Sequence, residues 1–265
     1  MTYNSNSLNS TLTSLMDETN YSFDDKLINY ELRLTTVHLL RALKSIMSYN
    51  ELSKLFNINI SLLCRYIKGQ VIPSLEVARN IINIAMQEKL FIKLLHKNYE
   101  ESSSNSINPD IFYFISAYVA YLINFSSIDK IVCFFPKDAM FGYSLSLNIG
   151  KKLLFAYNER SLFPEKYYEH VYYIRSQIGY EDLKRSVAIP KNSIKNSDRL
   201  VIAGFYLENI EDYINLLILL KKVKLKVEVK YCIFISTISK KLYEIFTEKV
   251  KNIAEECTTI LVSDL

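Results

Sequence analysis

Long apolar runs are missing from this 265-residue chain. A membrane-spanning helix needs about 18 or more uninterrupted apolar residues, and lysines interrupt even the segment from Leu216 to Leu225. The first residues, Met1 to Thr13, are rich in Asn, Ser and Thr, and they have neither the basic start nor the apolar centre of a secretion signal. We therefore expect a cytoplasmic protein with no membrane partner and a partly disordered lead-in over residues 1–29.

Cysteine is also scarce, and its spacing excludes the common metal-binding patterns. The chain has no CxxC pair and no Cys/His spacing typical of a zinc site. We expect free, buried thiols in a reducing compartment, with no metal and no cofactor. The four cysteines are Cys64, Cys133, Cys232 and Cys257.

The charge is unevenly distributed along the chain. The formal net charge is +4, but the segment from Arg33 to Lys97 holds ten basic residues against three acidic ones. This segment therefore carries +7, and the rest of the chain carries −3. A basic module joined to a mildly acidic one favours a nucleic-acid partner for the basic part, although a solvated basic face would have the same composition.

A cluster of Ser, Asn and Pro from Glu101 to Asp110 marks a linker between two different patterns. Before it, apolar residues recur three and four apart, which predicts an all-helical head over residues 30–100. After it, strands and helices alternate, which predicts an α/β domain over residues 111–265 with a mostly parallel sheet. Short apolar strands are predicted at 131–135, 152–157, 200–203, 227–235 and 259–262, and helices at 111–125, 141–147, 210–222 and 240–256.

Two short helices joined by a tight turn are predicted between Tyr49 and Ser74. Asn57 suits the left-handed conformation that such a turn needs, and Asn59 is placed to cap the second helix. Gly69 ends that helix, and Pro73-Ser74 starts the next. Over about 45 residues this stretch resembles the lambda-repressor/Cro-type helix-turn-helix family. It departs from the family pattern at Ser53, Asn57 and Ile67, each of which is sterically tolerable.

The resemblance implies that Ile60 to Lys68 enters the major groove of double-stranded DNA. Side chains near base edges would include Arg65, which can pair with guanine, and Ile60, which can contact a thymine methyl group. A helix pair used only for packing or protein contact is the alternative. The residues assigned to DNA binding are Tyr49, Asn59, Ile60, Ser61, Cys64, Arg65, Lys68 and Gln70, of which Tyr49, Lys68 and Gln70 are placed for phosphates.

The second half resembles the type I phosphoribosyltransferase fold over roughly residues 111–236. The order of elements carries the resemblance. One apolar strand precedes Pro136-Lys137-Asp138-Ala139, where members of the family bind pyrophosphate. A second apolar strand leads into the segment 203–209. The family's paired acids align with Ala203 and Gly204, and its Thr/Gly-rich phosphate loop is absent. From these losses we predict that the protein is not an enzyme.

A small-molecule effector that binds this domain would contact the residues that remain in the two segments 136–139 and 203–209. Such an effector would be a nucleotide or sugar phosphate, but a domain that only dimerises fits the sequence equally well. The aromatic segment from Phe163 to Tyr180 is a ligand lid, a dimer contact or, as we favour, the ordinary packing of an irregular insert. The candidate ligand-binding residues are Lys137, Asp138, Phe205, Tyr206, Leu207, Glu208 and Asn209.

Together these patterns predict a homodimeric, sequence-specific transcription regulator. Its construction would be similar to that of archaeal regulators that fuse the two parts, and repression by occluding a promoter is the simplest mechanism. Two heads related by a twofold axis would bind half-sites about one helical turn apart, or a multiple of it. The alternatives are an active phosphoribosyltransferase with a regulatory head and an architectural DNA-binding protein with little sequence preference.

Overall fold

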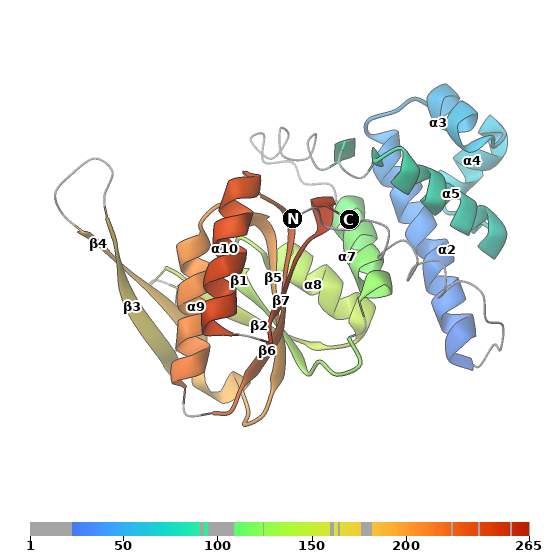
Figure 1. Ribbon diagram of the computed structural model, residues 1–265. Coiled ribbons are helices and arrows are strands. Elements are labelled where there is room, and N and C mark those ends of the chain that lie inside the picture. Colours follow the sequence, from blue (N-terminus) through green and yellow to red (C-terminus); the bar gives the residue numbers. More distant parts are fainter. Residues whose placement is uncertain are drawn as a thin grey trace.

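The computed structural model describes residues 23–90, 93–94, 109–123, 125–159, 162–163, 165–175, 182–223, 225–237, 239–254 and 256–264. A group of helices stands beside a body built on one sheet (Figure 1). The helices are α2 (Phe23–Lys44), α3 (Tyr49–Phe56), α4 (Ile60–Ile67), α5 (Leu75–Gln87), α7 (Pro109–Leu122), α8 (Ala139–Ile149), α9 (Ile210–Lys222) and α10 (Lys240–Ile253). The strands are β1 (Lys130–Phe135), β2 (Lys152–Tyr157), β3 (Tyr167–Arg175), β4 (Asp182–Pro190), β5 (Arg199–Leu207), β6 (Glu228–Thr237) and β7 (Thr258–Leu261).

The N-terminal helices begin and end where local chemistry predicts. Ser48 and Glu51 form a reciprocal capping box at the start of α3. Asn57 has a φ of 53°, which places it in the left-handed region, and Asn59 Oδ1 accepts a hydrogen bond of 2.8 Å from the backbone N–H of Ser61. Helix α2 begins at Phe23, so residues 23–29, assigned from the sequence to a partly disordered lead-in, are helical.

The predicted lead-in and linker fall mostly on residues that the structure does not describe. Residues 1–22 and 101–108 lie outside the described part of the chain. The last two residues of the predicted linker, Pro109 and Asp110, form the first turn of α7.

One seven-stranded sheet in the order β3-β4-β2-β1-β5-β6-β7 forms the body. Strands β2, β1, β5, β6 and β7 run parallel to one another, and β4 pairs antiparallel with both β2 and β3. The fold class predicted from the sequence, α/β with a mostly parallel sheet, is confirmed. No described helix is both long and apolar enough to cross a membrane.

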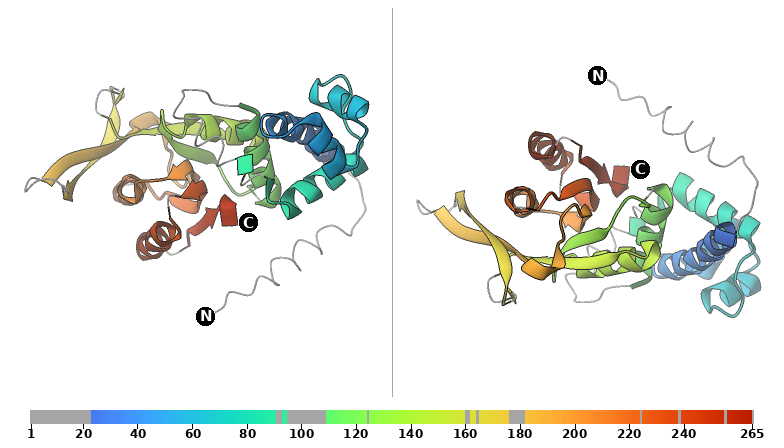
Figure 2. Two further views of the ribbon diagram at one scale, coloured as in Figure 1. Left: turned by 90° about the horizontal axis from the view of Figure 1, so that it is seen from above. Right: turned by 90° about the horizontal axis from the view of Figure 1, so that it is seen from below.

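Successive residues of the central strands face two separate cores. Ile131 and Val201 pack with α7 and α8 on one face, whereas Val132 and Ile202 pack with α9 and α10 on the other. Helices therefore cover both faces of the sheet (Figure 2). Burial on both faces explains why these strands read in the sequence as continuous apolar runs.

The segment read as an irregular insert, Phe163 to Tyr180, contributes strand β3, which pairs with β4. Strands β3 and β4 pair over nine residues, from Tyr167 opposite Pro190 to Arg175 opposite Asp182. The prediction of an irregular insert was wrong because the two strands, YYEHVYYIR and DLKRSVAIP, mix aromatic, apolar and charged residues without the regular alternation that marks a strand in the sequence. The hairpin reaches beyond the rest of the body (Figure 1).

The N-terminal helices and the body share one apolar core. Leu39 and Leu43 of α2 belong to the same buried cluster as Phe112 and Ile115 of α7. His38 Nδ1 lies 2.6 Å from Asp110 Oδ1, which adds a polar contact between α2 and α7. The apolar core is therefore continuous between α2 and α7.

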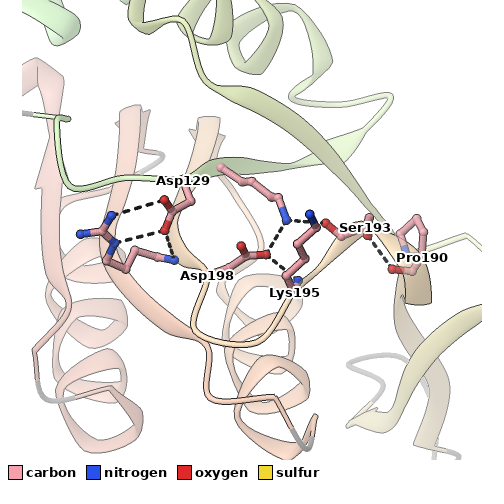
Figure 3. Close-up of polar contacts among 7 residues, drawn as sticks. Asp129, Pro190, Ser193, Lys195 and Asp198 are labelled. Carbon is pink, nitrogen blue, oxygen red and sulfur yellow. Dashed lines mark hydrogen bonds and ion pairs between the residues drawn. The ribbon is translucent and has the colours of Figure 1, made fainter.

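A polar network joins the first residues of β1 and β5 at the amino edge of the sheet (Figure 3). Lys130 Nζ pairs with Asp198 Oδ2 and donates a hydrogen bond of 2.9 Å to the carbonyl oxygen of Ser193. Asp198 Oδ2 also accepts from the backbone N–H of Lys195 at 2.6 Å. Both side chains of the ion pair are only 10% exposed. Each charge is therefore stabilised mainly by the opposite charge and not by water.

Candidate functional site

Helix α4 presents one face to the core and the other to solvent. Leu63 and Tyr66 are buried, whereas Ile60, Ser61 and Arg65 are exposed. The helix lies at the end of the molecule farthest from the β3–β4 hairpin (Figure 1). Its exposed side is therefore accessible to a large partner.

Two arginines of α2 hold the end of α4 and the loop that follows. Arg41 Nε donates to the carbonyl oxygen of Ile67 at 2.8 Å, and Arg33 Nε donates to that of Pro73 at 2.6 Å. Gly69 has a φ of +69°, and a Cβ there would lie 2.9 Å from Arg41 Nη2. These two basic residues contributed to the positive charge counted in the sequence, but their Nε–H groups are committed to backbone carbonyls.

The residues assigned to phosphate contact surround this exposed face. Lys68 and Gln70 are exposed just after α4. Tyr49 is half-buried, with Lys44 Nζ 4.9 Å from its ring centroid. Cys64 is half-buried and lies behind this face, with its Sγ 4.0 Å from the Tyr49 hydroxyl.

The carboxyl ends of β1 and β5 form a second candidate site. The chain leaves β1 for α8 on one face of the sheet and leaves β5 for α9 on the other. In open α/β sheets, ligands bind in the crevice that such a switch of direction creates. Lys137 and Asp138 follow β1, and Glu208 and Asn209 follow β5, so this edge holds residues that the sequence singled out.

Asp138 is buried at this edge and connects the two strands. Its Oδ1 accepts from the backbone N–H of Phe205 at 2.9 Å, and its Oδ2 accepts from the Tyr213 hydroxyl at 2.7 Å. Burial raises the pKa of Asp138 to about 6, although the positive charge of Lys137 and the hydrogen bonds act in the opposite direction. The carboxyl group therefore titrates close to neutral pH.

Of the other predicted ligand residues, some are accessible to solvent and others are engaged in packing or in capping a helix. Glu208 is exposed, whereas Leu207 is fully buried in the core beneath α9. Asn209 caps α9, because its Oδ1 accepts from the backbone N–H of Glu211 at 3.1 Å. Phe205 packs against Phe112 with ring centroids 4.7 Å apart, and Tyr206 is half-buried.

A pocket that sequence reasoning missed lies at the carboxyl end of β2. Its volume is about 540 Å³, and it is lined by Asn158, Glu159, Lys184, Arg185 and Ser186. Beside it, the buried Asp212 accepts hydrogen bonds from the Tyr172 hydroxyl and from Asn158 Nδ2. The adjacent basic residues Lys184 and Arg185 were the signal that the sequence offered. Because no strand was predicted at these residues, nothing indicated that they lie next to β2.

Metal-binding clusters are absent from the described residues. No group of three or more His, Cys, Asp or Glu side chains among them could hold an ion. The four cysteines are free thiols, and three of them are buried.

No protein-family model and no curated protein matches the chain. Similar solved structures include adenine phosphoribosyltransferase from Thermoanaerobacter pseudethanolicus, at 16% identity and a TM-score of 0.47, covering 64% of this chain and 86% of that one. The enzyme from Leishmania tarentolae is 17% identical at a TM-score of 0.48, covering 61% and 74%. The enzyme from Trypanosoma brucei is 10% identical at 0.47, covering 58% and 64%. The likeness is one of fold alone.

The prediction that the protein is not an enzyme is contradicted, because these solved structures are all enzymes. That prediction rested on the missing acids at Ala203 and Gly204. A Cβ at Gly204 would lie 2.6 Å from both Phe234 Cε1 and the Tyr213 hydroxyl, so no acid fits there. The acids near this edge include Asp138 and Glu208, and we drop the prediction.

Proposed function

We propose that the protein is a dimeric transcription regulator that reads DNA through α4. The observation that carries this proposal is the solvent-facing side of α4, where Ile60, Ser61 and Arg65 are exposed while Leu63 and Tyr66 anchor the helix. A recognition helix needs this division, because its inner face must be fixed for its outer face to read bases. The two arginines that hold the end of α4 add to this rigidity.

The exposed side chains suit the chemistry of a major groove. Arg65 can donate two hydrogen bonds to guanine, and Ile60 can pack on a thymine methyl group. Lys68 and Gln70 contact phosphates, which set the position of the helix rather than the sequence it reads. Repression would follow when the bound protein occludes a promoter.

Replacing Arg65 with alanine is expected to remove sequence preference at one position of each half-site. A bidentate contact to guanine contributes about 1–3 kcal/mol of discrimination, equivalent to about 5- to 150-fold. The measurement is sequencing of genomic DNA recovered with the purified protein, followed by titration of the selected site. Arg79→Ala is the matched control, because Arg79 is exposed on α5 in the same head and its loss changes the charge equally.

A shared palindromic motif recovered by the wild type and Arg79→Ala, and relaxed in Arg65→Ala, would support the proposal. Uniform recovery of all DNA would overturn it and favour an architectural protein, whose binding depends steeply on salt but little on sequence.

Phosphoribosyl transfer by the α/β body is the second candidate. It is favoured by the position of Asp138 at the switch of strand direction and by a polar pocket carrying Lys184 and Arg185, which suits an anionic substrate. In this reaction adenine would displace pyrophosphate from phosphoribosyl pyrophosphate to form AMP. A regulatory DNA-binding head is compatible with such an activity.

The assay for this candidate is formation of AMP from labelled adenine and phosphoribosyl pyrophosphate. Turnover is expected to fall about tenfold or more in Arg185→Ala, because a hydrogen bond to a charged group contributes about 1.5–3 kcal/mol. Arg79→Ala again serves as the control, since Arg79 lies on α5 in the head. Absence of AMP with excess of both substrates would remove this candidate and leave DNA binding untouched.

A further inference from the structure

We infer that a second copy of this chain docks on the outer side of α8 and on the face of β3 that lies on the same side of the sheet. The inference deepens the proposed function, because it names the interface of the proposed dimer. The surface consists of Met140, Tyr143 and Leu147 on α8 and Val171 and Tyr173 on β3; it is called the α8–β3 surface below.

Helix α8 is apolar on its outer side as well as its inner side. Phe141, Gly142 and Leu145 are buried against the sheet. Met140, Tyr143 and Leu147 recur three and four residues apart on the opposite side and are 40%, 59% and 59% exposed. A helix that only covered a sheet would carry polar or charged residues there.

Strand β3 adds to the apolar surface on the same side of the sheet. The Tyr172 hydroxyl donates to Asp212 of α9, so Tyr172 faces the α9 side. Neighbouring residues of a strand point to opposite faces, so Val171 and Tyr173 face the side on which α8 lies. Tyr173 is 66% exposed. Figure 2 shows α8 and α9 on opposite sides of the sheet.

The surface has the composition and size of an interface core. Helix α8, AMFGYSLSLNI, contains no charged residue, and interface cores are depleted in charge and enriched in Tyr and Met. The five side chains are 36% to 66% exposed, so they form the apolar centre of an interface whose standard size is about 800 Å² on each partner.

The lack of charge on α8 also favours a second copy over other occupants. In a twofold interface the same patch meets itself, so charges near the axis would face like charges. A membrane-surface helix carries Lys or Arg on its polar side, and α8 has none. The uncharged outer side of α8, which carries Tyr, Met and Leu, is therefore best covered by a second copy of the chain.

Docking through α8 would also fix the distance between the two heads. Asn148 Nδ2 of α8 donates to Ser116 Oγ of α7 at 2.7 Å, and α7 contacts α2 through the Asp110–His38 pair. Helix α7 therefore connects the interface on α8 to the head, because it contacts both α8 and α2. Such a rigid path is what reading two half-sites at a set spacing requires.

The test replaces both Tyr143 and Leu147 with glutamate in the full-length chain and measures its mass by sedimentation. The wild type is expected to be a dimer at micromolar concentration, and the dissociation constant is expected to rise about 100-fold or more in the variant, because central aromatic and apolar anchors dominate interfaces. Ile245→Glu is the control, since Ile245 is an exposed apolar residue of α10 on the other face of the sheet. Both positions of the test variant are exposed, so circular dichroism is expected to match the wild type.

A second variant with lysine at positions 143 and 147 makes the test specific. Mixing the glutamate and lysine variants is expected to restore dimers, because opposite charges then meet across the interface. A monomeric wild type, or a glutamate variant that remains dimeric, would overturn the inference.

Failure of this inference is distinguishable from failure of the proposed function. Binding to a single half-site is expected to be unchanged in the glutamate variant, whereas the gain from a palindrome is expected to be lost. If the wild type dimerises through α8 but shows no sequence preference, the proposed function fails and the interface stands.

Discussion

Replacing Asp198 with alanine is expected to lower the free energy of unfolding by about 3–5 kcal/mol, because it leaves the Lys130 ammonium group buried without its partner. Both side chains are only 10% exposed, and Asp198 is the acid that pairs with Lys130. The substitution also removes the acceptor of the Lys195 N–H. Urea denaturation at neutral pH, with a constant m-value, measures the loss.

The pair between Asp129 and Arg199 is the matched control, because it joins the starts of the same two strands (Figure 3). Its side chains are 38% and 42% exposed, so solvent already screens the charges. Asp129→Ala is expected to cost only about 1 kcal/mol. Adding Lys130→Met to Asp198→Ala is expected to recover part of the loss, since no uncompensated charge remains. Equal costs for Asp198→Ala and Asp129→Ala would contradict the prediction.

The Asp138 carboxyl group is expected to make stability fall as the pH rises from about 4 to 7. Burial raises its pKa from 3.8 to about 6, so the folded state holds the proton more tightly than the unfolded chain does. The contribution is fully present below pH 3.8 and is lost as the pH rises through 6. The shift corresponds to about 3 kcal/mol.

Asp138→Asn isolates this contribution, because an amide keeps the acceptor for the Phe205 N–H but does not titrate in this range. The difference in the free energy of unfolding between the two proteins is expected to change by about 3 kcal/mol from pH 4 to 7, in favour of the variant. Other titrating groups cancel in this difference. Tyr213→Phe removes a hydrogen bond to the carboxylate and is expected to shift the transition to higher pH. A difference that does not vary with pH would contradict a raised pKa.

Local signals predicted much of the fold. The limits of β2 and α9 match the residues predicted from the sequence. Asn57, Asn59 and Gly69 adopt the turn and cap conformations expected of them. These features depend on hydrogen bonds and backbone preferences within one or two turns of chain, and such information is contained in a short window of sequence.

Features that depend on distant residues escaped prediction. The bases of the pocket lie on a strand whose apolar run is only three residues long, and its pairing with β3 and β2 brings Lys184 and Arg185 beside Asn158. The roles of Arg33 and Arg41 depended on the packing of α2 against α4. Basic residues look alike in a charge count, whether they face a partner or a backbone carbonyl.

The sequence by itself determined the alternation of elements, the caps of α3 and α4 and the two-sided burial of the central strands, because each follows from neighbouring residues. The tertiary structure alone decided that Asp138 is buried with a raised pKa, that Lys130 pairs with an acid 68 residues away, and that α8 leaves an apolar side uncovered. Desolvation and pairing are properties of the groups that surround a side chain. Those groups come from separate parts of the chain, so only the folded arrangement determines them.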